Sequence, residues 1–404
     1  MRIASFRALR PRPDHADRVV CAPYDILEPG EVRTLAENSP LSFLQVTRPE
    51  VNFPPEQDPY ADEVYVEAAR RLHGLVEDGV LLRDKTPSLY VYRLEKGHHV
   101  QTGVAACCRV DDYAEGRIKR HEGTLAVKEE DRTRLIKTLR AHTGPVFLTY
   151  RDVPAIHRIV NTIVAGQPVV QIQATGGVRH TVWRAAERSG ALADAFDELV
   201  PACYIADGHH RAAAALRAAR DGPDNGTSAP WDRFVGVLFP ASQVRILPYH
   251  RCLRDLNGRD ADSFLSQIDS RFLVQKLSGP PLLERGRIGL FAAGQWRELS
   301  WADGPADDPV LALDVSVLQE RLFRPVLGLA GRAADAHVDY VTGLHGVGEL
   351  EARVRDGRAV CAFAMHPVSV EDVMAVADAG GKMPPKSTWF EPKLASGLLV
   401  HTVD

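Results

Sequence analysis

The chain has 404 residues, and this length predicts either two domains or one large elaborated domain. Its 45% hydrophobic and 25% charged residues are typical of a soluble globular protein. The formal net charge of −4 argues against a protein whose main task is to coat DNA, because such proteins are usually basic. No apolar run approaches the about 18 residues that a membrane-spanning helix needs, and the N-terminal stretch lacks the apolar segment of a signal peptide. We therefore expect a cytoplasmic protein with no membrane partner.

The predicted helices and strands alternate along the N-terminal half without a regular βαβ repeat. Residues 61–79 place apolar side chains at helical spacing and end on a glycine, which is typical of a helix C-terminus. Strand pairs joined by tight turns are predicted around residues 95–98 and 176–177. An amphipathic helix is predicted over residues 128–142, and the strand CYIA at 203–206 leads into an alanine-rich helix. This mixture predicts an α+β, or mixed α/β, fold class.

The pattern of helices and strands restarts beyond residue 255. The runs DADSFLSQIDSRF and DVSVLQERLFRPVL are predicted helices, and RIGLFAAGQWRELSW between them is a predicted hairpin. We therefore expect a first region over residues 1–254 and a C-terminal α/β region over residues 255–404. Trp389 and Phe390 would be costly to leave exposed, so the tail at residues 380–400 is expected to pack back onto the body of the protein, toward the site described next.

The stretch CYIADGHHRAAAALRAAR combines a short strand, a polar turn and a helix. The first amides of a helix have no intrahelical partner, and the macrodipole gives its N-terminus roughly +0.5 of an elementary charge, so such an end binds phosphate well. Gly208 lets a ligand approach the backbone closely. His209, His210 and Arg211 add donors and positive charge, and the arginine can grip phosphate through two N–H groups. Asp207 can accept a proton from a hydroxyl, hold Mg²⁺ or orient a histidine.

The alternative for this turn is a capped helix with solvated basic side chains. Asp207 would then be only the N-cap. An N-cap explains one of the five polar or turn-type residues and leaves two histidines and an arginine after a glycine unexplained. The sequence therefore favours a phosphate site.

A second polar segment, KRHEGT, is followed closely by KEEDR. His121 and Glu122 offer a base or a metal ligand, and Thr124 offers a hydroxyl near the start of a helix. The alternative is a charged loop that leads into a helix, because acidic residues favour the first turn of a helix. Both interpretations stay open from these residues alone.

The segment GGKMPPKSTWFEPK places lysines among glycines, prolines and two aromatic residues. Lys386, Ser387 and Thr388 superficially match the end of a P-loop, but the required G-x-x-x-x-G-K-[ST] spacing is absent. We therefore reject a P-loop and retain these three residues, together with Lys393, as candidates for a site. The alternative is an exposed terminus with solvated lysines.

These motifs resemble those of two known groups of proteins. YIADGHHRAAAAL resembles the strand, turn and helix that form a nucleotide phosphate site in the ParB/sulfiredoxin-like superfamily, and its D-G-H-H-R form is similar to that of free L-serine kinases in this superfamily. Over almost its full length the chain also resembles the family known as domain of unknown function 1015, through APYDIL, RHEGT with EDR, IADGHHR, PYHR and MPPKSTWFEPKLASGL. The resemblance implies a ParB/sulfiredoxin-like nucleotide-binding core, which is the catalytic region, with additional α/β elaboration.

The resemblance also implies phosphorylation of free L-serine to O-phosphoserine, with ATP or ADP as donor. Phosphoryl transfer needs positioned positive charge, Mg²⁺ and a group that accepts the hydroxyl proton. The implied catalytic residues are Asp207, Glu122 and His210, and either Asp207 or Glu122 would be the base or the Mg²⁺ ligand. The implied nucleotide-binding residues are Gly208, His209, Arg211, Lys386, Ser387, Thr388 and Lys393. The implied substrate-binding residues are His121, Thr124 and Arg251.

The sequence departs from two other branches of this superfamily. Sulfiredoxins need a cysteine in this motif, and His209 or His210 stands in its place, which argues against repair of sulfinic acids. The DNA-partition proteins carry a helix-turn-helix after the nucleotide module, and no convincing one is found here, so nucleic acid is not the expected partner. A nucleotide-dependent switch that touches DNA, and a phosphatase or nucleotide hydrolase, are the alternatives to the kinase.

Overall fold

The computed structural model describes residues 1–27, 29–222, 231–304, 306–329 and 336–403. They form two compact units, which we call unit 1 (Met1–Val244 and Pro392–Asp404) and unit 2 (Arg245–Glu391). Unit 1 is therefore discontinuous, because the chain leaves it after Val244 and returns at Pro392. Every helix in the described ranges is too short or too polar to span a bilayer.

Unit 1 is built on a mixed sheet. Its strand order is β6-β11-β8-β12-β5-β4-β10-β9, with β1 paired to β5. The pairs β11–β6 and β12–β8 are parallel, and β11–β8 is antiparallel. The strands are β1 Ile3–Ala4, β4 Tyr90–Lys96, β5 His99–Arg109, β6 Ile118–Lys119, β8 Val146–Tyr150, β9 Val170–Gln173, β10 Arg179–Arg184, β11 Cys203–Asp207 and β12 Arg233–Pro240. Two small pairs join β2 (Leu9–Pro11) to β3 (Leu81–Arg83) and β7 (Ala141–His142) to β21 (His401–Thr402).

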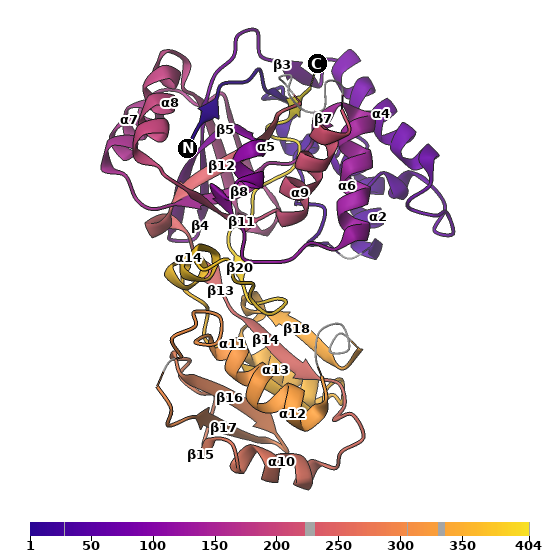
Figure 1. Cartoon of the computed structure of the whole chain (residues 1–404). Helices are drawn as coiled ribbons and strands as arrows, with labels where there is room; N and C mark the ends of the chain where they lie inside the picture. The colour runs from indigo at the N-terminus through magenta and orange to yellow at the C-terminus, as the bar shows by residue number, and fades with distance from the viewer. Residues whose placement is uncertain (28, 223–230, 305, 330–335, 404) are drawn as a thin grey trace. The chain divides into compact units, whose positions relative to one another are not determined.

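Helices flank this sheet. They are α1 Ala16–Val19, α2 Pro29–Asn38, α3 Leu44–Thr47, α4 Asp62–Glu77, α5 Val110–Ala114, α6 Ala126–Leu139, α7 Pro154–Val164, α8 Ser189–Leu199 and α9 His209–Arg220. Figure 1 shows α7 and α8 on one side of the strands and α9, α6 and α4 on the other. Ala212 and Ala215 of α9 belong to the same apolar cluster as Val104, Leu148 and Ile205 of the strands. These small side chains let α9 lie close to the sheet, which fixes its N-terminus at the end of β11.

The predicted elements of unit 1 are largely confirmed, and so is the mixed α/β fold class. Residues 61–79 contain α4, and the two predicted turns join β4 to β5 and β9 to β10. The helix predicted over 128–142 was wrong at its C-terminal end, because α6 stops at Leu139. Arg140 adopts a left-handed conformation with φ 51°, which ends the helix, and Ala141–His142 pair as a strand with the C-terminal segment.

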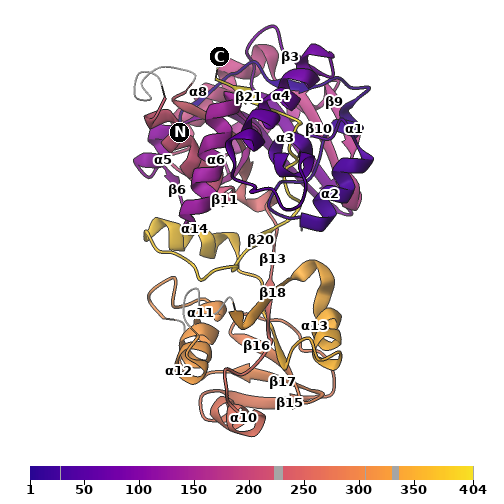
Figure 2. The ribbon, with the colours of Figure 1, turned by 90° about the vertical axis from the view of Figure 1, so that its right-hand side faces the viewer.

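Unit 2 has a separate sheet with the strand order β15-β17-β16-β19-β14-β18. Its strands are β14 Tyr249–Leu253, β15 Leu273–Leu277, β16 Arg287–Ala292, β17 Gln295–Ser300, β18 Val338–Thr342 and β19 Cys361–Ala364, and β13 Ile246–Leu247 pairs with β20 Trp389–Phe390. Its helices are α10 Ala261–Asp269, α11 Asp314–Leu318, α12 Arg324–Leu327, α13 Gly346–Arg355 and α14 Val370–Asp378. Figure 2 shows α11 and α12 to one side of β16 and β17 and α13 to the other. The predicted hairpin is β16–β17, and the two predicted helices correspond to α10 and to α11 with α12.

Candidate functional site

The turn between β11 and α9 depends on a glycine. Asp207 is the last residue of β11, and Gly208 is the N-cap residue of α9 with φ 102°. A Cβ at Gly208 would lie 3.0 Å from the guanidinium carbon of Arg211, so the position needs both the backbone freedom and the small size of glycine. The interpretation of Asp207 as the N-cap was wrong, because Gly208 holds that position and no side chain caps α9.

The carboxylate of Asp207 joins two cations. Lys393 donates from Nζ to Oδ1 of Asp207 at 2.6 Å, and Arg211 donates from Nη2 to Oδ2 at 2.5 Å. Burial alone would raise the pKa of this carboxyl group, but the charges of Lys393 and Arg211 outweigh burial and hold the pKa of Asp207 well below its ordinary value. Arg211 also donates from Nη1 to the carbonyl of Pro145. The cluster therefore presents two positive charges and one negative charge next to the start of α9.

Two buried histidines lie against this cluster. The rings of His121 and His209 meet edge to face, with 4.6 Å between centroids, and Nδ1 of His209 lies 3.7 Å from Oε2 of Glu122. Burial lowers the pKa of His121 to about 4, and burial together with His121 lowers the pKa of His209 well below its ordinary value. Both rings are therefore neutral at pH 7. Nε2 of His209 is buried without a hydrogen-bond partner among the described residues, so it is available to a ligand.

His210 turns toward a different helix. Its Nε2 accepts a hydrogen bond of 3.0 Å from the backbone N–H of Leu125, the N-cap residue of α6. Burial, assisted by the charge of Lys128, lowers the pKa of His210 and keeps the ring neutral, as an acceptor must be. Thr124 donates from Oγ1 to Oε2 of Glu129 in the same turn, at 3.1 Å. His210 thus ties the start of α9 to the start of α6.

The structure brings most of the predicted site residues together in unit 1. Those in unit 1 are His121, Glu122, Thr124, Asp207, Gly208, His209, His210, Arg211 and Lys393, and those in unit 2 are Arg251, Lys386, Ser387 and Thr388. A shared site for the two groups stays a prediction.

In unit 2, Arg251 supports the loop that carries Lys386. Arg251 is only 4% exposed; it donates from Nη1 to the carbonyl of Tyr249 at 2.5 Å and from Nη2 to that of Lys386 at 3.2 Å. Nζ of Lys386 lies 5.6 Å from the centre of the Tyr249 ring, and Ser387 donates from Oγ to the carbonyl of Pro384 at 2.6 Å. These contacts order the loop within unit 2. The predicted role of Arg251 in substrate binding stays a prediction.

Sequence reasoning missed Arg132 of α6 as a member of the unit 1 site. Arg132 is 7% exposed, donates to the carbonyl of Thr47 at 3.0 Å, and places its guanidinium carbon 4.3 Å from the centre of the Tyr24 ring. Arg132, Tyr24 and Arg211 line a cavity of about 30 Å³. The sequence could have indicated this position. Arg132 lies at helical spacing from Leu135 and the other buried apolar residues of α6, which places it on the buried face of the helix.

The described residues contain no group of three or more His, Cys, Asp or Glu side chains arranged to hold a metal ion. Mg²⁺ does not require such a group, since it usually binds through one or two carboxylates together with waters and phosphate oxygens. Asp207 already accepts from two cations. Glu122, whose side chain is 34% exposed, is therefore the more accessible of the two predicted carboxylates.

Comparison with known proteins decides the family. The profile of the family described as protein of unknown function (DUF1015) matches residues 3–316. The chain belongs to the DUF1015 family. This confirms the family resemblance seen in the motifs, and the matched range covers nearly all of the first part of unit 1 and about half of unit 2. No protein of curated function matches this DUF1015 chain.

Several solved structures are similar to the chain at low identity. A conserved hypothetical protein from Pyrococcus furiosus is 13% identical, with 74% of this chain and 95% of that chain covered and a TM-score of 0.38. A free serine kinase in complex with AMP is 13% identical, with 74% and 91% covered and a TM-score of 0.40. SbnI with a C-terminal truncation, from Staphylococcus aureus, is 11% identical, with 74% and 87% covered and a TM-score of 0.40. Similarity at this level carries no argument about function.

Proposed function

We propose that this DUF1015 protein is a Mg²⁺-dependent phosphotransferase that phosphorylates free L-serine to O-phosphoserine, with ATP or ADP as the donor. The main support for the proposal is that Lys393 and Arg211 both form ion pairs with Asp207, and that Asp207 lies directly before the N-terminus of α9. The choice of L-serine as the molecule that accepts the phosphoryl group rests on the resemblance of the D-G-H-H-R turn to that of free L-serine kinases.

The phosphates of the nucleotide would bind at the start of α9. The first amides of this helix lack side-chain caps, and Gly208 leaves the backbone open to close approach. Arg211 and Lys393 supply the positive charge that offsets the phosphate oxygens. His209 has a free ring nitrogen for a further hydrogen bond. Mg²⁺, held by phosphate oxygens and waters, would offset the remaining negative charge.

The geometry favours Glu122 over Asp207 as the group that accepts the proton. Asp207 is held ionised by two cations, and its low pKa makes it a weak base. Glu122 is the more accessible carboxylate, with its side chain 34% exposed against 20% for Asp207. In the proposed step, the serine Oγ attacks the terminal phosphorus, the bond from that phosphorus to the bridging oxygen breaks, and the serine proton passes to Glu122. Asp207 then positions Arg211 and Lys393 rather than taking part in proton transfer.

Lys386, Ser387 and Thr388 lie in unit 2, and their roles in nucleotide binding stay predictions. Arg251 supports their loop through backbone carbonyls, so we assign it the role of positioning this loop instead of direct contact with substrate. We therefore keep the predicted catalytic region over residues 1–254, and the predicted return of the tail at residues 380–400 toward its site, as parts of this proposal.

Phosphorus NMR of the purified protein tests this function. The protein is incubated with Mg²⁺, L-serine and one of ATP, ADP or CTP. A phosphoserine signal that requires serine supports the kinase. Nucleotide hydrolysis that is indifferent to serine contradicts the kinase and favours a hydrolase, and retention of DNA only with nucleotide favours a switch. Full activity in both His210→Ala and Arg211→Ala variants would show that the site lies elsewhere.

A further inference from the structure

A second cavity in unit 1 lies away from the Asp207 cluster. It has a volume of about 280 Å³ and is lined at the ends of β8 and β12 and along the start of α7. Its apolar walls include Val153, Pro154, Val160 and Pro240. The ring of Tyr150 completes the wall and packs edge to face on Phe196, with 5.1 Å between centroids. The cavity is therefore large enough for a small organic molecule and has an apolar surface to hold one.

Tyr150 brings an unused polar group to this cavity. The residue is only 3% exposed, and its hydroxyl has no hydrogen-bond partner in the described part of the chain. Its oxygen is not among the fully buried unsatisfied atoms, so it is accessible where Tyr150 lines the cavity, and tyrosine hydroxyls in such places usually find a hydrogen-bond partner. A ligand in the cavity would supply that partner.

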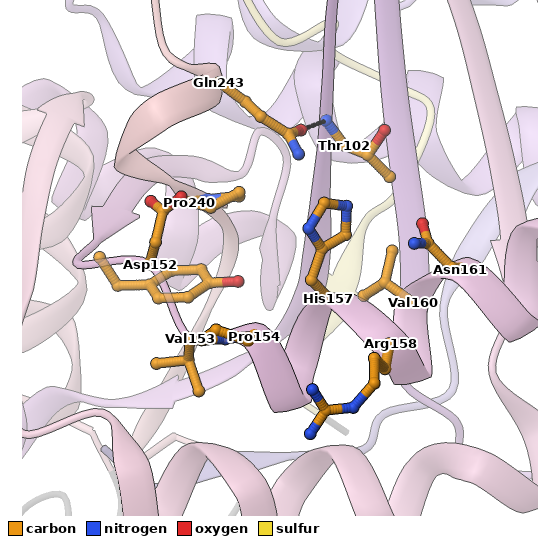
Figure 3. A pocket seen from close by; sticks show the side chains of 11 residues that line it. Thr102, Asp152, Val153, Pro154, His157, Arg158, Val160, Asn161, Pro240 and Gln243 are labelled. Atoms are coloured by element: carbon orange, nitrogen blue, oxygen red, sulfur yellow. Dashed lines mark hydrogen bonds between the residues drawn. The ribbon is translucent and has the colours of Figure 1, made fainter.

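The first two turns of α7 add further donors. His157, Arg158 and Asn161 line the cavity, and no side-chain hydrogen bond or ion pair of theirs is found among the described residues. Figure 3 shows the ring of His157 between the Thr102–Gln243 pair and the Val153–Pro154 start of the helix. Gln243 uses its Oε1 to accept from the backbone N–H of Thr102 at 2.7 Å, which leaves the amide N–H₂ of Gln243 for a ligand. The N-terminus of α7 also has no side-chain cap.

The carboxylate of Asp152 is the one acidic group that lines the cavity. It already accepts hydrogen bonds from Ser242, from the backbone N–H at 3.0 Å and from the hydroxyl. The groups left for a ligand thus all include a donor, and one of them, Arg158, is cationic. Such a set fits an oxyanion better than a cation or a neutral sugar.

We propose that this cavity binds a small organic anion, a carboxylate or phosphate monoester on an apolar body. The apolar part packs against Tyr150, Val160 and Pro240, and the anionic group accepts from Arg158, Asn161 and the Tyr150 hydroxyl. The site is separate from the Asp207 cluster. Asp207 pairs with Phe147 near one end of β8, and Tyr150 lies three residues further along that strand, about 10 Å away.

Isothermal titration calorimetry of the full chain tests the proposal with benzoate, phenyl phosphate and the neutral benzyl alcohol as probes. Binding of either anion at millimolar concentration, with benzyl alcohol at least tenfold weaker, is the expected result. The tighter of the two anions identifies the anionic group as carboxylate or phosphate. Equal binding of benzyl alcohol, or no binding of either anion, overturns the proposal.

Variants locate the binding at this cavity. Arg158→Gln should weaken binding of the tighter anion about tenfold or more, because a charge-assisted hydrogen bond is lost. Tyr150→Phe should weaken it several-fold without lowering the melting temperature, since the hydroxyl has no partner among the described residues. Asp152→Asn should strengthen it by removing a like charge. Arg188→Gln, at an exposed arginine outside the cavity, is the matched control. Unchanged affinity in both Arg158→Gln and Tyr150→Phe overturns the assignment.

Discussion

The Nζ atom of Lys393 lies 2.6 Å from Oδ1 of Asp207, although 186 residues separate the two in the chain. The C-terminal segment of unit 1 reaches this position through further contacts. The backbone N–H of Ser396 donates to the carbonyl of Cys21, and His401 pairs with His142 in β21–β7. The segment that closes the sequence is therefore part of the same site as the central turn.

Lys393→Met should destabilise unit 1, because it removes one of the two cations that offset a largely buried carboxylate. The side chains of Lys393 and Asp207 are 10% and 20% exposed, and breaking such a pair costs about 3 kcal/mol. Calorimetric unfolding, which can resolve the two units, measures the loss. Lys85→Met, at an exposed lysine, is the control and should leave the transition unchanged. Equal melting temperatures for Lys393→Met and the wild type would count against the pair.

Gly208→Ala should be more damaging than a substitution at another glycine with positive φ. A Cβ at Gly208 would crowd the Arg211 guanidinium, whereas the same change at Gly116, with φ 77°, meets nothing within 4 Å. We expect Gly116→Ala to cost about 1 kcal/mol of unfolding free energy from backbone strain alone, and Gly208→Ala to cost about 1–2 kcal/mol more. Thermal unfolding of both variants supplies the comparison. Costs of equal size would contradict the contact between Gly208 and Arg211.

The stability of unit 1 should fall as the pH drops from 7 to 5. The folded-state pKa of His121 is about 4, below the ordinary value of 6.5, because burial disfavours the charged ring. Between pH 7 and 5 the His121 ring becomes protonated in the unfolded state but stays neutral in the folded state. This residue alone therefore lowers the unfolding free energy by about 2 kcal/mol. His121→Gln should therefore show a weaker dependence of melting temperature on pH. His73→Gln, whose side chain is 73% exposed, should keep the wild-type dependence. A wild-type slope in His121→Gln would refute the buried neutral ring.

Arg251→Met should loosen the loop at residues 384–388 of unit 2. Three carbonyls, those of Tyr249, Pro385 and Lys386, lose their donor, and the buried one, that of Tyr249, costs about 1–3 kcal/mol when it is left unsatisfied. Hydrogen exchange followed by mass spectrometry should show faster exchange in this loop. Arg254→Met removes an arginine that is 47% exposed and should leave the loop protected. Equal protection in the two variants would mean that Arg251 does not hold the loop.

Local sequence patterns predicted the elements of the site but not their partners. The ADGHHR turn between a strand and an alanine-rich helix was visible because glycine and helix propensity act over a few residues. The return of the tail toward the site was expected, but the ion pair from Lys393 to Asp207 could not be predicted, because a sequence pattern does not show which lysine of the tail reaches the turn. A sequence pattern also could not predict that His209 and His210 make different contacts. One ring faces His121 and the other accepts from Leu125, and only the packing of α6 beside α9 separates them.

Transfer of radiolabelled phosphate from ATP or ADP to L-serine, measured for the wild type and for Lys393→Met, Glu122→Gln and Lys85→Met, tests the central claim most directly. The account predicts serine-dependent phosphoserine in the wild type and Lys85→Met, and losses of about a hundredfold or more in Lys393→Met and Glu122→Gln. Absence of phosphoserine from the wild type with every donor tested, or wild-type rates in both site variants, would contradict it.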